Sequence, residues 1–502
     1  MGTLKFYVDA EAPRTGFTHY WEKCVGSCHG YTALREDYRK QLKKAAEDIG
    51  FQYIRFHGIL NDDMCVVQEN RPGEYTYNFF NIDNIFDFLL SIGMKPFMEI
   101  GFMPSAFASG SQTCFHYRGN VTVPKDYQAW DRFIAEMMKH FIKRYGLDEV
   151  RQWYFEVWNE PNLKFFFAGE QEDYFILYEH TARAIKSVDE GLQVGGPATA
   201  INAWIPELID YCSQNGVPLD FISTHHYPTD DPLWNSGMSL EEFFADIEKK
   251  AEEGNAEKIR KQATVYRRGV LKEMTERARK EAGKYPLYYT EWNTSATLPD
   301  DVHDYPYSAA LVTKTVIDNI GLVDAYSFWT FTDIFEEHAQ YCGEYHGGFG
   351  LQTVHGIPKP TYRAFELLHL LGSERYPVIE EQGTVGMLAA SGRDGGLCIL
   401  AYNQQILDQP VKNETIELSI DNENVSSAEI LRIDETHGNS RKLWEEMGCP
   451  EYPDADQMKM LYQASVIVGE TLEVQKTETG IKVEFEIPEY GVALIRFKAD
   501  TL

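Results

Sequence analysis

Short, apolar, β-rich runs alternate with longer helical patterns from about residue 20 to residue 360 of this 502-residue chain. Such alternation favours one parallel sheet, because two parallel strands need a crossover connection that a helix usually supplies. The runs lie at 51–60, 95–102, 152–159, 192–198, 220–227, 286–293 and 325–333, with a first one near 21–30. Eight runs predict a (β/α)8 TIM barrel. The alternative is a doubly wound open sheet, but no glycine-rich phosphate loop follows any of the runs.

The segments between the runs have the period of amphipathic helices. In 126–146, apolar residues recur at Trp130, Phe133 and Met137, and 171–191 has a similar pattern. One connection, 228–285, is unusually long and carries many charges at helical spacing. Solvated helices are the simplest interpretation of this segment, with a lid or a subunit contact as the alternative.

The pattern changes after about residue 370, where apolar residues alternate with polar ones in period two. This predicts an all-β module, most simply a sandwich. The first 12 residues are also strand-like and could join that module. We therefore expect an α/β protein with a (β/α)8 barrel at 13–360 and an appended β-sandwich at 361–502, joined by the N-terminal strand 1–12.

Charge and composition narrow the possible partners. A net charge of −30 argues against nucleic acid and against an anionic membrane surface, so a neutral ligand is the easier partner. No run of 18 apolar residues is present, and the first residues lack the apolar region of a signal peptide. The eight scattered cysteines fit reduced thiols and no zinc site. We expect a cytoplasmic protein.

Catalytic groups of a barrel enzyme stand at the carboxyl ends of its strands. Applied to the predicted strands, this rule selects a short set of residues. They are Arg55 and His57 on the second strand, Asn159 and Glu160 on the fourth, His225 and Tyr227 on the sixth, Glu291 on the seventh and Trp329 on the eighth.

Glu160 and Glu291 are the pair that most suggests chemistry. A closed barrel would direct both carboxyl groups into one cavity, although 131 residues separate them (291 − 160). Glycoside hydrolysis needs such a pair, one protonated as the acid and one ionised. A separation of about 5 Å would make the second a nucleophile, and about 6.5–9.5 Å would leave room for water. A lone strand-end glutamate is more often a structural ion-pair partner, but two such glutamates in one barrel favour a catalytic pair.

The neighbouring residues each have a functional and a structural interpretation. Asn159 could bond a sugar hydroxyl, and Trp329 could stack on a sugar, although core packing explains a tryptophan equally well. Tyr227 could hold the carboxylate of Glu291, and Arg55 could lower its pKa or form a structural ion pair. His225 and Tyr227 share one strand face and His226 points the other way, which argues against a metal pair from the two adjacent histidines. For Glu99 we favour a structural role.

At these residues the chain resembles family 39 of the glycoside hydrolases, the β-xylosidases. The resemblance covers nearly the whole chain. It rests on the segments "YIRFHGIL", "MEIGFMPSAFASGSQT", "GNVTVPKDYQAW", "FEVWNEPNLKFF", "YYTEWNTS", "FWTFTDIFEE", "HGGFGL" and "IPKPTYRAF". The resemblance implies a retaining mechanism with Glu160 as acid/base and Glu291 as nucleophile. It also implies that His57, His225 and Glu337 contact the sugar, and that the barrel and sandwich assemble as tetramers.

Two features depart from the β-xylosidase pattern. The segment "THHYPTD" leads into a longer connection, and Trp292 stands where a tyrosine is common; both departures lie near the expected sugar site. We predict an exo-acting retaining β-D-xylosidase that acts on short oligosaccharides or aryl glycosides without a cofactor or metal. The alternatives are the same chemistry on another sugar (a β-glucosidase, an α-L-arabinosidase or a uronic-acid-cleaving enzyme) and a non-catalytic carbohydrate-binding barrel.

Overall fold

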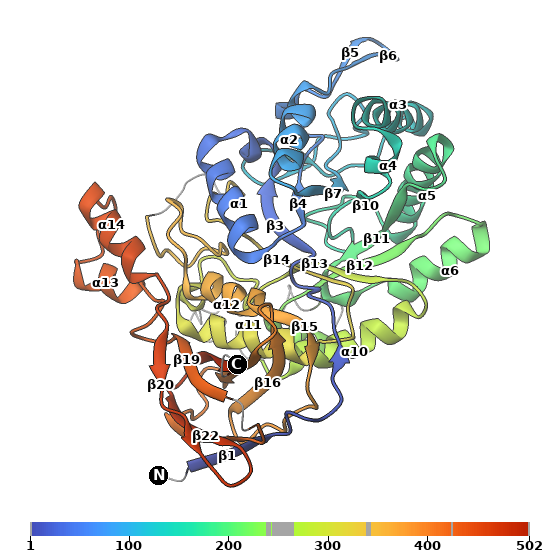
Figure 1. The fold of residues 1–502 in the computed structure, drawn as a ribbon. Helices are drawn as coiled ribbons and strands as arrows, with labels where there is room; N and C mark the ends of the chain where they lie inside the picture. The colour runs from blue at the N-terminus through green and yellow to red at the C-terminus, as the bar shows by residue number, and fades with distance from the viewer. Residues whose placement is uncertain (1–2, 237–241, 243–265, 338–342, 423–424, 500–502) are drawn as a thin grey trace.

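A computed structural model describes residues 3–236, 242, 266–337, 343–422 and 425–499 (Figure 1). The predicted barrel is confirmed: eight parallel strands close in the order β10-β11-β12-β13-β14-β3-β4-β7. Their bounds are β3 (Cys24–His29), β4 (Tyr53–His57), β7 (Lys95–Ile100), β10 (Tyr154–Val157), β11 (Gln193–Thr199), β12 (Phe221–His226), β13 (Leu287–Trp292) and β14 (Ala325–Phe328).

Helices surround the barrel, so its strands are buried on both faces, as in other all-parallel sheets. All six residues of β12, for example, are buried. The helices are α1 (Glu36–Ile49), α2 (Phe80–Ser91), α3 (Tyr127–Tyr145), α4 (Leu147–Val150), α5 (Gln171–Val188), α6 (Ile205–Asn215), α7 (Asp231–Ser236), α10 (Val270–Ala282), α11 (Pro306–Asp318) and α12 (Pro360–His369). α3 begins where its sequence predicts, because the Asp126 carboxylate caps the first turn.

Short elements lie in the connections between the barrel strands and helices. Two small hairpins pair β5 (Val67–Arg71) with β6 (Glu74–Tyr77) and β8 (Thr113–Cys114) with β9 (Gly119–Asn120). The single 3-10 turns are η1 (Gly30–Leu34), η2 (Asp62–Met64), η3 (Ala200–Asn202), η4 (Pro228–Asp230) and η5 (Asp301–Asp304).

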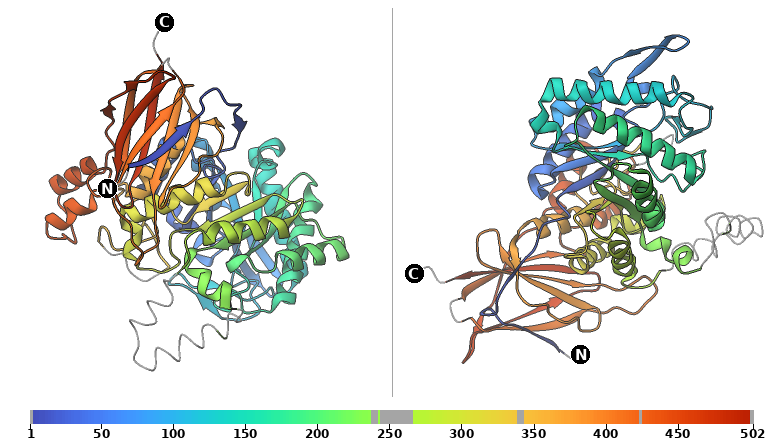
Figure 2. Two further views of the ribbon diagram at one scale, coloured as in Figure 1. Left: turned by 90° about the horizontal axis from the view of Figure 1, so that it is seen from below. Right: turned by 90° about the vertical axis from the view of Figure 1, so that its right-hand side faces the viewer.

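A sandwich of two sheets lies beside the barrel (Figure 2). Its larger sheet runs β2-β15-β16-β17-β23-β19-β20, with β2 (Thr15–Gly16), β15 (Leu371–Arg375), β16 (Val385–Gly392), β17 (Leu397–Asn403), β23 (Val492–Ala499), β19 (Val425–Ile433) and β20 (Glu470–Leu472). Its smaller sheet runs β1-β18-β22-β21, with β1 (Thr3–Val8), β18 (Glu414–Ile420), β22 (Ile481–Ile487) and β21 (Gln475–Lys476).

The larger sheet is covered on both faces. Every residue of β16 and β17 is buried, because α11 and α12 of the barrel contact one face and the smaller sheet covers the other. β1 pairs in parallel with β18, so the N-terminal strand lies in the sandwich. These contacts support our proposal of a barrel domain and a sandwich domain, with the N-terminal strand belonging to the sandwich. Because α12 begins at Pro360 and packs on α1 and α11, we propose that the boundary follows this helix.

The region after residue 370 is not wholly β. Two helices, α13 (Arg441–Glu446) and α14 (Ala455–Ala464), interrupt the sandwich between β19 and β20, which the period-two pattern did not predict. Residues 237–241 and 243–265 of the predicted insertion 228–285 lie outside the described residues, so the role of the insertion stays a prediction. Within the described part of the chain, none of the helices combines the length and apolar character needed to span a bilayer.

Candidate active site

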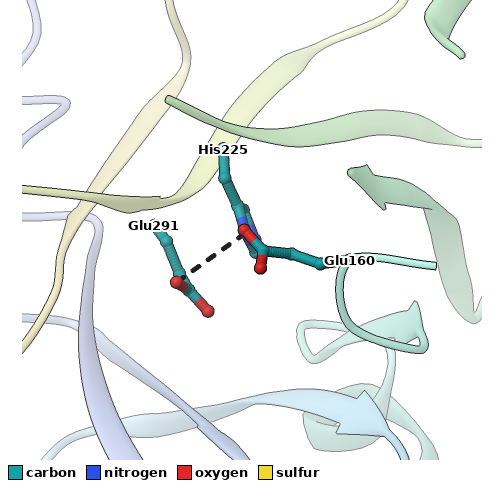
Figure 3. A group of neighbouring side chains, drawn as sticks. All are labelled: Glu160, His225 and Glu291. Carbon is teal, nitrogen blue, oxygen red and sulfur yellow. Dashed lines mark hydrogen bonds and ion pairs between the residues drawn. The ribbon is translucent and has the colours of Figure 1, made fainter. Parts of the chain in front are cut away.

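Three ionisable side chains meet at the carboxyl ends of the barrel strands. Glu160 follows β10, His225 lies near the end of β12, and Glu291 lies near the end of β13. Figure 3 shows the three side chains directed toward one another. One carboxylate oxygen of each glutamate and one ring nitrogen of His225 all lie within 4.8 Å of one another. The structure therefore brings together the two carboxylates that the strand-end rule selected.

The backbone that presents Glu160 is unusual. Trp158 has a φ of 73° and Glu160 a φ of 43°, a region that costs non-glycine residues free energy. Local hydrogen bonds hold this turn: the Trp158 indole N–H donates to the carbonyl of Phe166 at 2.9 Å, and the Glu160 N–H donates to the carbonyl of Ala198 at 2.8 Å. The turn directs the Glu160 carboxyl group toward His225, whose Nδ1 lies 3.0 Å from Oε1.

Glu291 is held by two donors. The Arg55 guanidinium donates to its Oε1 at 2.5 Å, and the Tyr227 hydroxyl donates to its Oε2 at 2.9 Å. Both partners were predicted from the sequence for this contact. Burial raises the pKa of Glu291, but Arg55, His57 and the Tyr227 hydroxyl act in the opposite direction.

The surroundings of Glu160 stabilise its ionised form less than those of Glu291 do. Burial raises the pKa of Glu160 well above its usual range, and the charges of Glu291 and Asp230 raise it further. The two carboxyl groups thus have different environments, although they are neighbours. As pH rises, Glu291 is the group whose surroundings favour ionisation, and Glu160 is the group that keeps its proton.

Arg55 lies at the centre of a buried layer of acids. Its guanidinium donates to Glu156 Oε2 at 2.7 Å and to Asn159 Oδ1 at 2.9 Å, and it lies 3.0 Å from Glu99 Oε2, in addition to its bond with Glu291. The Arg55 side chain is fully buried. Because an unpaired buried charge is very costly, these contacts explain how the cation is tolerated inside the barrel. Asn159 is thereby fixed beside Glu160.

His57 and Glu337 line another side of the same site. His57 Nε2 lies 3.6 Å from Glu291 and 3.7 Å from Glu337. Burial lowers the pKa of His57 to about 3, so its ring is neutral near pH 7. Burial and the charges of Glu291 and Glu99 raise the pKa of Glu337 well above its usual range, which favours its protonated form. The Trp329 ring lies 4.7 Å from the His57 ring, centroid to centroid, and also packs against Phe335. All nine predicted site residues therefore lie around one location.

Glu99 has the structural ion pair that we favoured for it, because it lies 3.0 Å from Arg55 inside the barrel. It also contacts His57 Nδ1 at 2.6 Å and so holds a residue of the site. One sequence-based interpretation changes. Trp292 does not face the sugar site as its position suggested. Its indole stacks on Tyr326 and packs edge-on against Phe328, on the outer face of the barrel. A departure at this position therefore bears on packing between barrel and helices.

Two further residues of the site were missed. Glu156 lies within β10, and its carboxylate accepts hydrogen bonds from Arg55 and from the Thr290 hydroxyl, the latter at 2.7 Å. An acid inside an apolar strand is a signal that could have identified Glu156. Thr290 gave no such signal, because strict alternation along β13 cannot place it and Glu291 in the same cavity.

A β-bulge explains why the side chains of Thr290 and Glu291 nevertheless enter the same cavity. Along β12 and β13, Thr224 pairs with Tyr289, and the next pair is His225 with Glu291, so Thr290 is one extra residue. Bulges re-aim side chains and are frequent near active sites. Here the bulge turns two consecutive side chains, those of Thr290 and Glu291, toward the centre of the barrel.

Glu160, His225 and Glu291 are also the one group with metal-like spacing among the residues that the structure describes. Their ligand atoms already have protein partners. Arg55 and Tyr227 occupy the oxygens of Glu291, and His225 contacts Glu160 and Thr290 through its two ring nitrogens. A metal would have to displace these bonds, so a hydrogen-bonded acid–base site fits the arrangement better. The predicted absence of a metal and cofactor stays a prediction.

Comparison with known proteins gives matches over most of the chain. The family described as "Glycosyl hydrolases family 39" matches residues 4–479. A β-xylosidase from Caldicellulosiruptor saccharolyticus is 50% identical over 455 residues, covering 90% of this chain and 89% of the relative. A β-xylosidase from Geobacillus stearothermophilus is 36% identical over 493 residues, covering 97% of this chain and 94% of the relative.

A solved structure shares the whole architecture. The crystal structure of a monomeric β-xylosidase from Caulobacter crescentus CB15 superposes with a TM-score of 0.84 at 30% sequence identity. The match covers 99% of this chain and 100% of the other. The barrel and the sandwich are therefore shared as one combination.

Proposed function

Because the chain belongs to glycosyl hydrolase family 39, and is thus a glycoside hydrolase, we propose that it is a retaining exo-β-D-xylosidase. It would release xylose from the non-reducing ends of short xylo-oligosaccharides. The choice of xylose is supported by the names of the two relatives that are 50% and 36% identical over most of the chain.

The close approach of Glu160 and Glu291 carries this proposal. Oxygens of the two carboxyl groups lie within 4.8 Å. Retaining glycosidases hold their carboxyl groups about 5–5.5 Å apart, whereas inverting enzymes need about 6.5–9.5 Å for an intervening water. The short separation supports double displacement. It also argues against a non-catalytic binding barrel, because placing two buried acids together is costly and sugar binding does not require it.

In the first step Glu160 acts as the acid. Its proton passes to the glycosidic oxygen while a Glu291 oxygen attacks the anomeric carbon, and the bond between that carbon and the leaving oxygen breaks. Arg55 and Tyr227 hold the attacking carboxylate in place through the bonds described above. The product of this step is a glycosyl ester on Glu291.

In the second step Glu160 acts as the base. Formation of the ester removes the negative charge of Glu291, one of the causes that raise the pKa of Glu160. The pKa of Glu160 therefore falls when the ester forms, and its carboxylate can take a proton from the attacking water. Water then releases the sugar with its original anomeric configuration, and Glu160 is protonated again.

The remaining residues of the site would bind the sugar. We assign hydroxyl contacts to Asn159, His57, His225 and Glu337, and a stacking surface to Trp329. The neutral His57 ring can donate or accept a hydrogen bond with a sugar hydroxyl, and the surroundings of Glu337 favour its protonated form. Glu337 in its protonated form can donate as well as accept.

Compartment and assembly are also proposals. The seven cysteines in the described part of the chain are free thiols, which supports the reducing cytoplasm as the location. We propose a homo-oligomer, with the tetramer implied by the family resemblance as the expected state. Light scattering of the purified protein tests it. A mass of one chain, 57.7 kDa, would contradict the tetramer. It would match the Caulobacter structure, which is described as a monomer.

The proposed function is tested by a panel of aryl β-glycosides whose products are followed by proton NMR. The expected result is highest kcat/KM on the β-xyloside, with β-xylose as the first product before mutarotation. The α-anomer as first product would contradict double displacement. Preference for a glucoside, an arabinoside or a uronide would contradict the sugar assignment and leave the chemistry intact.

A further inference from the structure

A chain of hydrogen bonds leads away from the acid/base glutamate into the barrel. His225 Nδ1 lies 3.0 Å from Glu160 Oε1, and His225 Nε2 lies 3.1 Å from the Thr290 hydroxyl oxygen. The Thr290 hydroxyl donates to Glu156 Oε1 at 2.7 Å. His225 and Glu156 are fully buried, and Thr290 is 1% exposed, so the two bonds of the Thr290 hydroxyl are shielded from solvent.

The single proton of the Thr290 hydroxyl determines the direction of the other bonds. Glu156 accepts from Arg55 on Oε2 and from Thr290 on Oε1, so its carboxylate acts as an acceptor on both sides. The Thr290 oxygen then has only lone pairs to offer to His225. His225 must donate from Nε2, and the proton of the neutral imidazole is placed there.

The other ring nitrogen consequently faces Glu160 without a proton. Burial lowers the pKa of His225 well below its usual range, which keeps the ring neutral, with Arg55, His57 and His226 acting in the same direction. The second close carboxylate, Glu291, lies 3.7 Å from Nδ1, beyond hydrogen-bonding distance. The lone pair on Nδ1 is thus available to accept from a protonated Glu160.

We propose that Thr290, anchored by Glu156, is a positioning residue that fixes the tautomer of His225. In this tautomer the unprotonated Nδ1 accepts a hydrogen bond from the carboxylic O–H of Glu160. This inference rests on the proposed acid/base role of Glu160. The protonated acid is held in a defined orientation before the reaction. When Glu160 has lost its proton, its carboxylate faces a lone pair, which favours recovery of a proton from water in the second step.

The bulge in β13 supplies the structural basis for this role. Without the extra residue between Tyr289 and Glu291, either Thr290 or Glu291 would point out of the barrel. The bulge lets one strand provide both the nucleophile and the residue that orients the partner of the acid.

Other charged groups also shift the pKa of Glu160, and they must stay the same in every variant that is compared. They come from each element packed around it and are Glu291 of β13, Asp230 of η4, Arg55 of β4 and Glu337 after β14. A substitution that leaves these groups in place isolates the contribution of the hydroxyl. Thr290→Val is such a change, because valine has the same branched shape without the hydroxyl, and Thr290→Ser is its matched control.

The test compares kcat/KM against pH for the wild type, Thr290→Val and Thr290→Ser, on xylobiose and on 2,4-dinitrophenyl β-xyloside. In Thr290→Val the imidazole can carry its proton on Nδ1 and stabilise ionised Glu160. We expect the basic limb for xylobiose to move down by about one pH unit, a tenfold loss above that limb. The dinitrophenolate leaving group departs without needing a proton, so kcat/KM for the aryl xyloside should change less than twofold. Thr290→Ser should restore the wild-type limb.

Several results would overturn the proposal. A Thr290→Val enzyme with an unchanged basic limb, or with equal losses on both substrates, would show that Thr290 serves packing only. Failure of Thr290→Ser to restore the limb would exclude the hydroxyl as the cause. Wild-type activity is measured first and tests the proposed function separately. If another glycoside is preferred, the same comparison is made with that sugar.

Discussion

The floor and the mouth of the barrel are built by the same strands with opposite chemistry. At the floor an apolar and aromatic layer is buried, formed by Cys24, Tyr53, Phe97, Tyr154, Phe221, Tyr288 and Ala325. Two residues further along four of these strands, the inward side chains are polar or charged. They are Arg55, Glu99, Glu156 and Thr290, all buried. A step of two residues keeps the same strand face, so the change occurs between adjacent layers of one barrel interior.

The difference shows how stability and chemistry are separated. The floor rings pack in stacked, edge-to-face and tilted pairs with centroids 5.1–5.9 Å apart, which removes apolar area from water without burying charge. The layer above buries an arginine among several acids, an arrangement that contributes little net stability. We infer that the floor stabilises the fold and that the mouth holds groups in charge states that water would not favour. The following variants test that division.

The largest effect is expected at the mouth, for Glu291→Ala. Without the nucleophile, kcat on an aryl β-xyloside should fall about 10⁴- to 10⁶-fold. Azide should fill the space of the carboxylate, attack the anomeric carbon directly and give the α-xylosyl azide, detected by NMR. Glu207→Ala, a change on the exposed face of α6, is the control and should keep wild-type turnover. Normal turnover by Glu291→Ala would remove this residue from the mechanism.

A smaller loss is expected for Glu160→Ala. On xylobiose, kcat/KM should fall about 10²- to 10⁴-fold, because the leaving oxygen needs a proton. On the dinitrophenyl xyloside the first step should be nearly unaffected, and added azide should give the β-xylosyl azide. The basic limb of the pH profile should disappear, since it reports the acid of the pair. Equal losses on both substrates would argue against an acid role.

The floor should respond in the opposite way. Phe97→Ala removes a ring that is 1% exposed and packs against three other aromatic residues. The free energy of unfolding should fall by about 3–5 kcal/mol, while kcat at 25 °C stays within about threefold of wild type. Denaturant unfolding and steady-state kinetics measure the two quantities. Phe80→Ala, at a ring that is 80% exposed, is the control with little change in either.

A pH-dependent effect on stability is expected for Glu99→Gln. Burial raises the pKa of Glu99 to about 7, so the fold favours its protonated form. The wild type then loses stability as pH rises from the unfolded value near 4.3 through about 7, and the loss is complete above that range. Glutamine does not ionise, so the variant lacks this pH-dependent loss of stability. Relative to wild type, Glu99→Gln should gain about 1–3 kcal/mol between pH 4 and pH 8.

The measurement is denaturant unfolding at several pH values. Glu207→Gln on the surface serves as the control and should show no such trend. A Glu99→Gln variant that becomes less stable relative to wild type as pH rises would mean that the ion pair with Arg55 outweighs the burial of the carboxylate. The mouth would then resemble a stabilising layer, and the contrast with the floor would weaken.

The sequence predicted the features that follow from local pattern. The barrel strands were predicted because each is a short apolar run, and parallel strands are buried on both faces. Glu160 and Glu291 were identified because a carboxylate that ends such a run is costly unless it has a purpose. The N-terminal strand was expected in the sandwich for its alternation, and β1 lies there.

The missed features depend on contacts between distant segments. The bulge at Thr290 is visible only in the register between β12 and β13, so periodicity indicated no role for Thr290. The packing of Trp292 likewise depends on a distant residue, Tyr326 of the next strand. The site contacts of Glu99 and Glu156 arise from Arg55 on another strand. The helices α13 and α14 are short insertions in a β-rich region, where the surrounding alternation dominated the prediction.

The central claim is that Glu291 forms a covalent ester while Glu160 moves the proton. Incubation with 2,4-dinitrophenyl 2-deoxy-2-fluoro-β-D-xyloside slows breakdown of that ester, and peptide mass spectrometry locates the attached sugar. The account predicts one fluoroxylosyl group per chain, on Glu291, with activity lost in step with labelling. Labelling of another carboxylate, or rapid turnover of active enzyme with no ester, would contradict it.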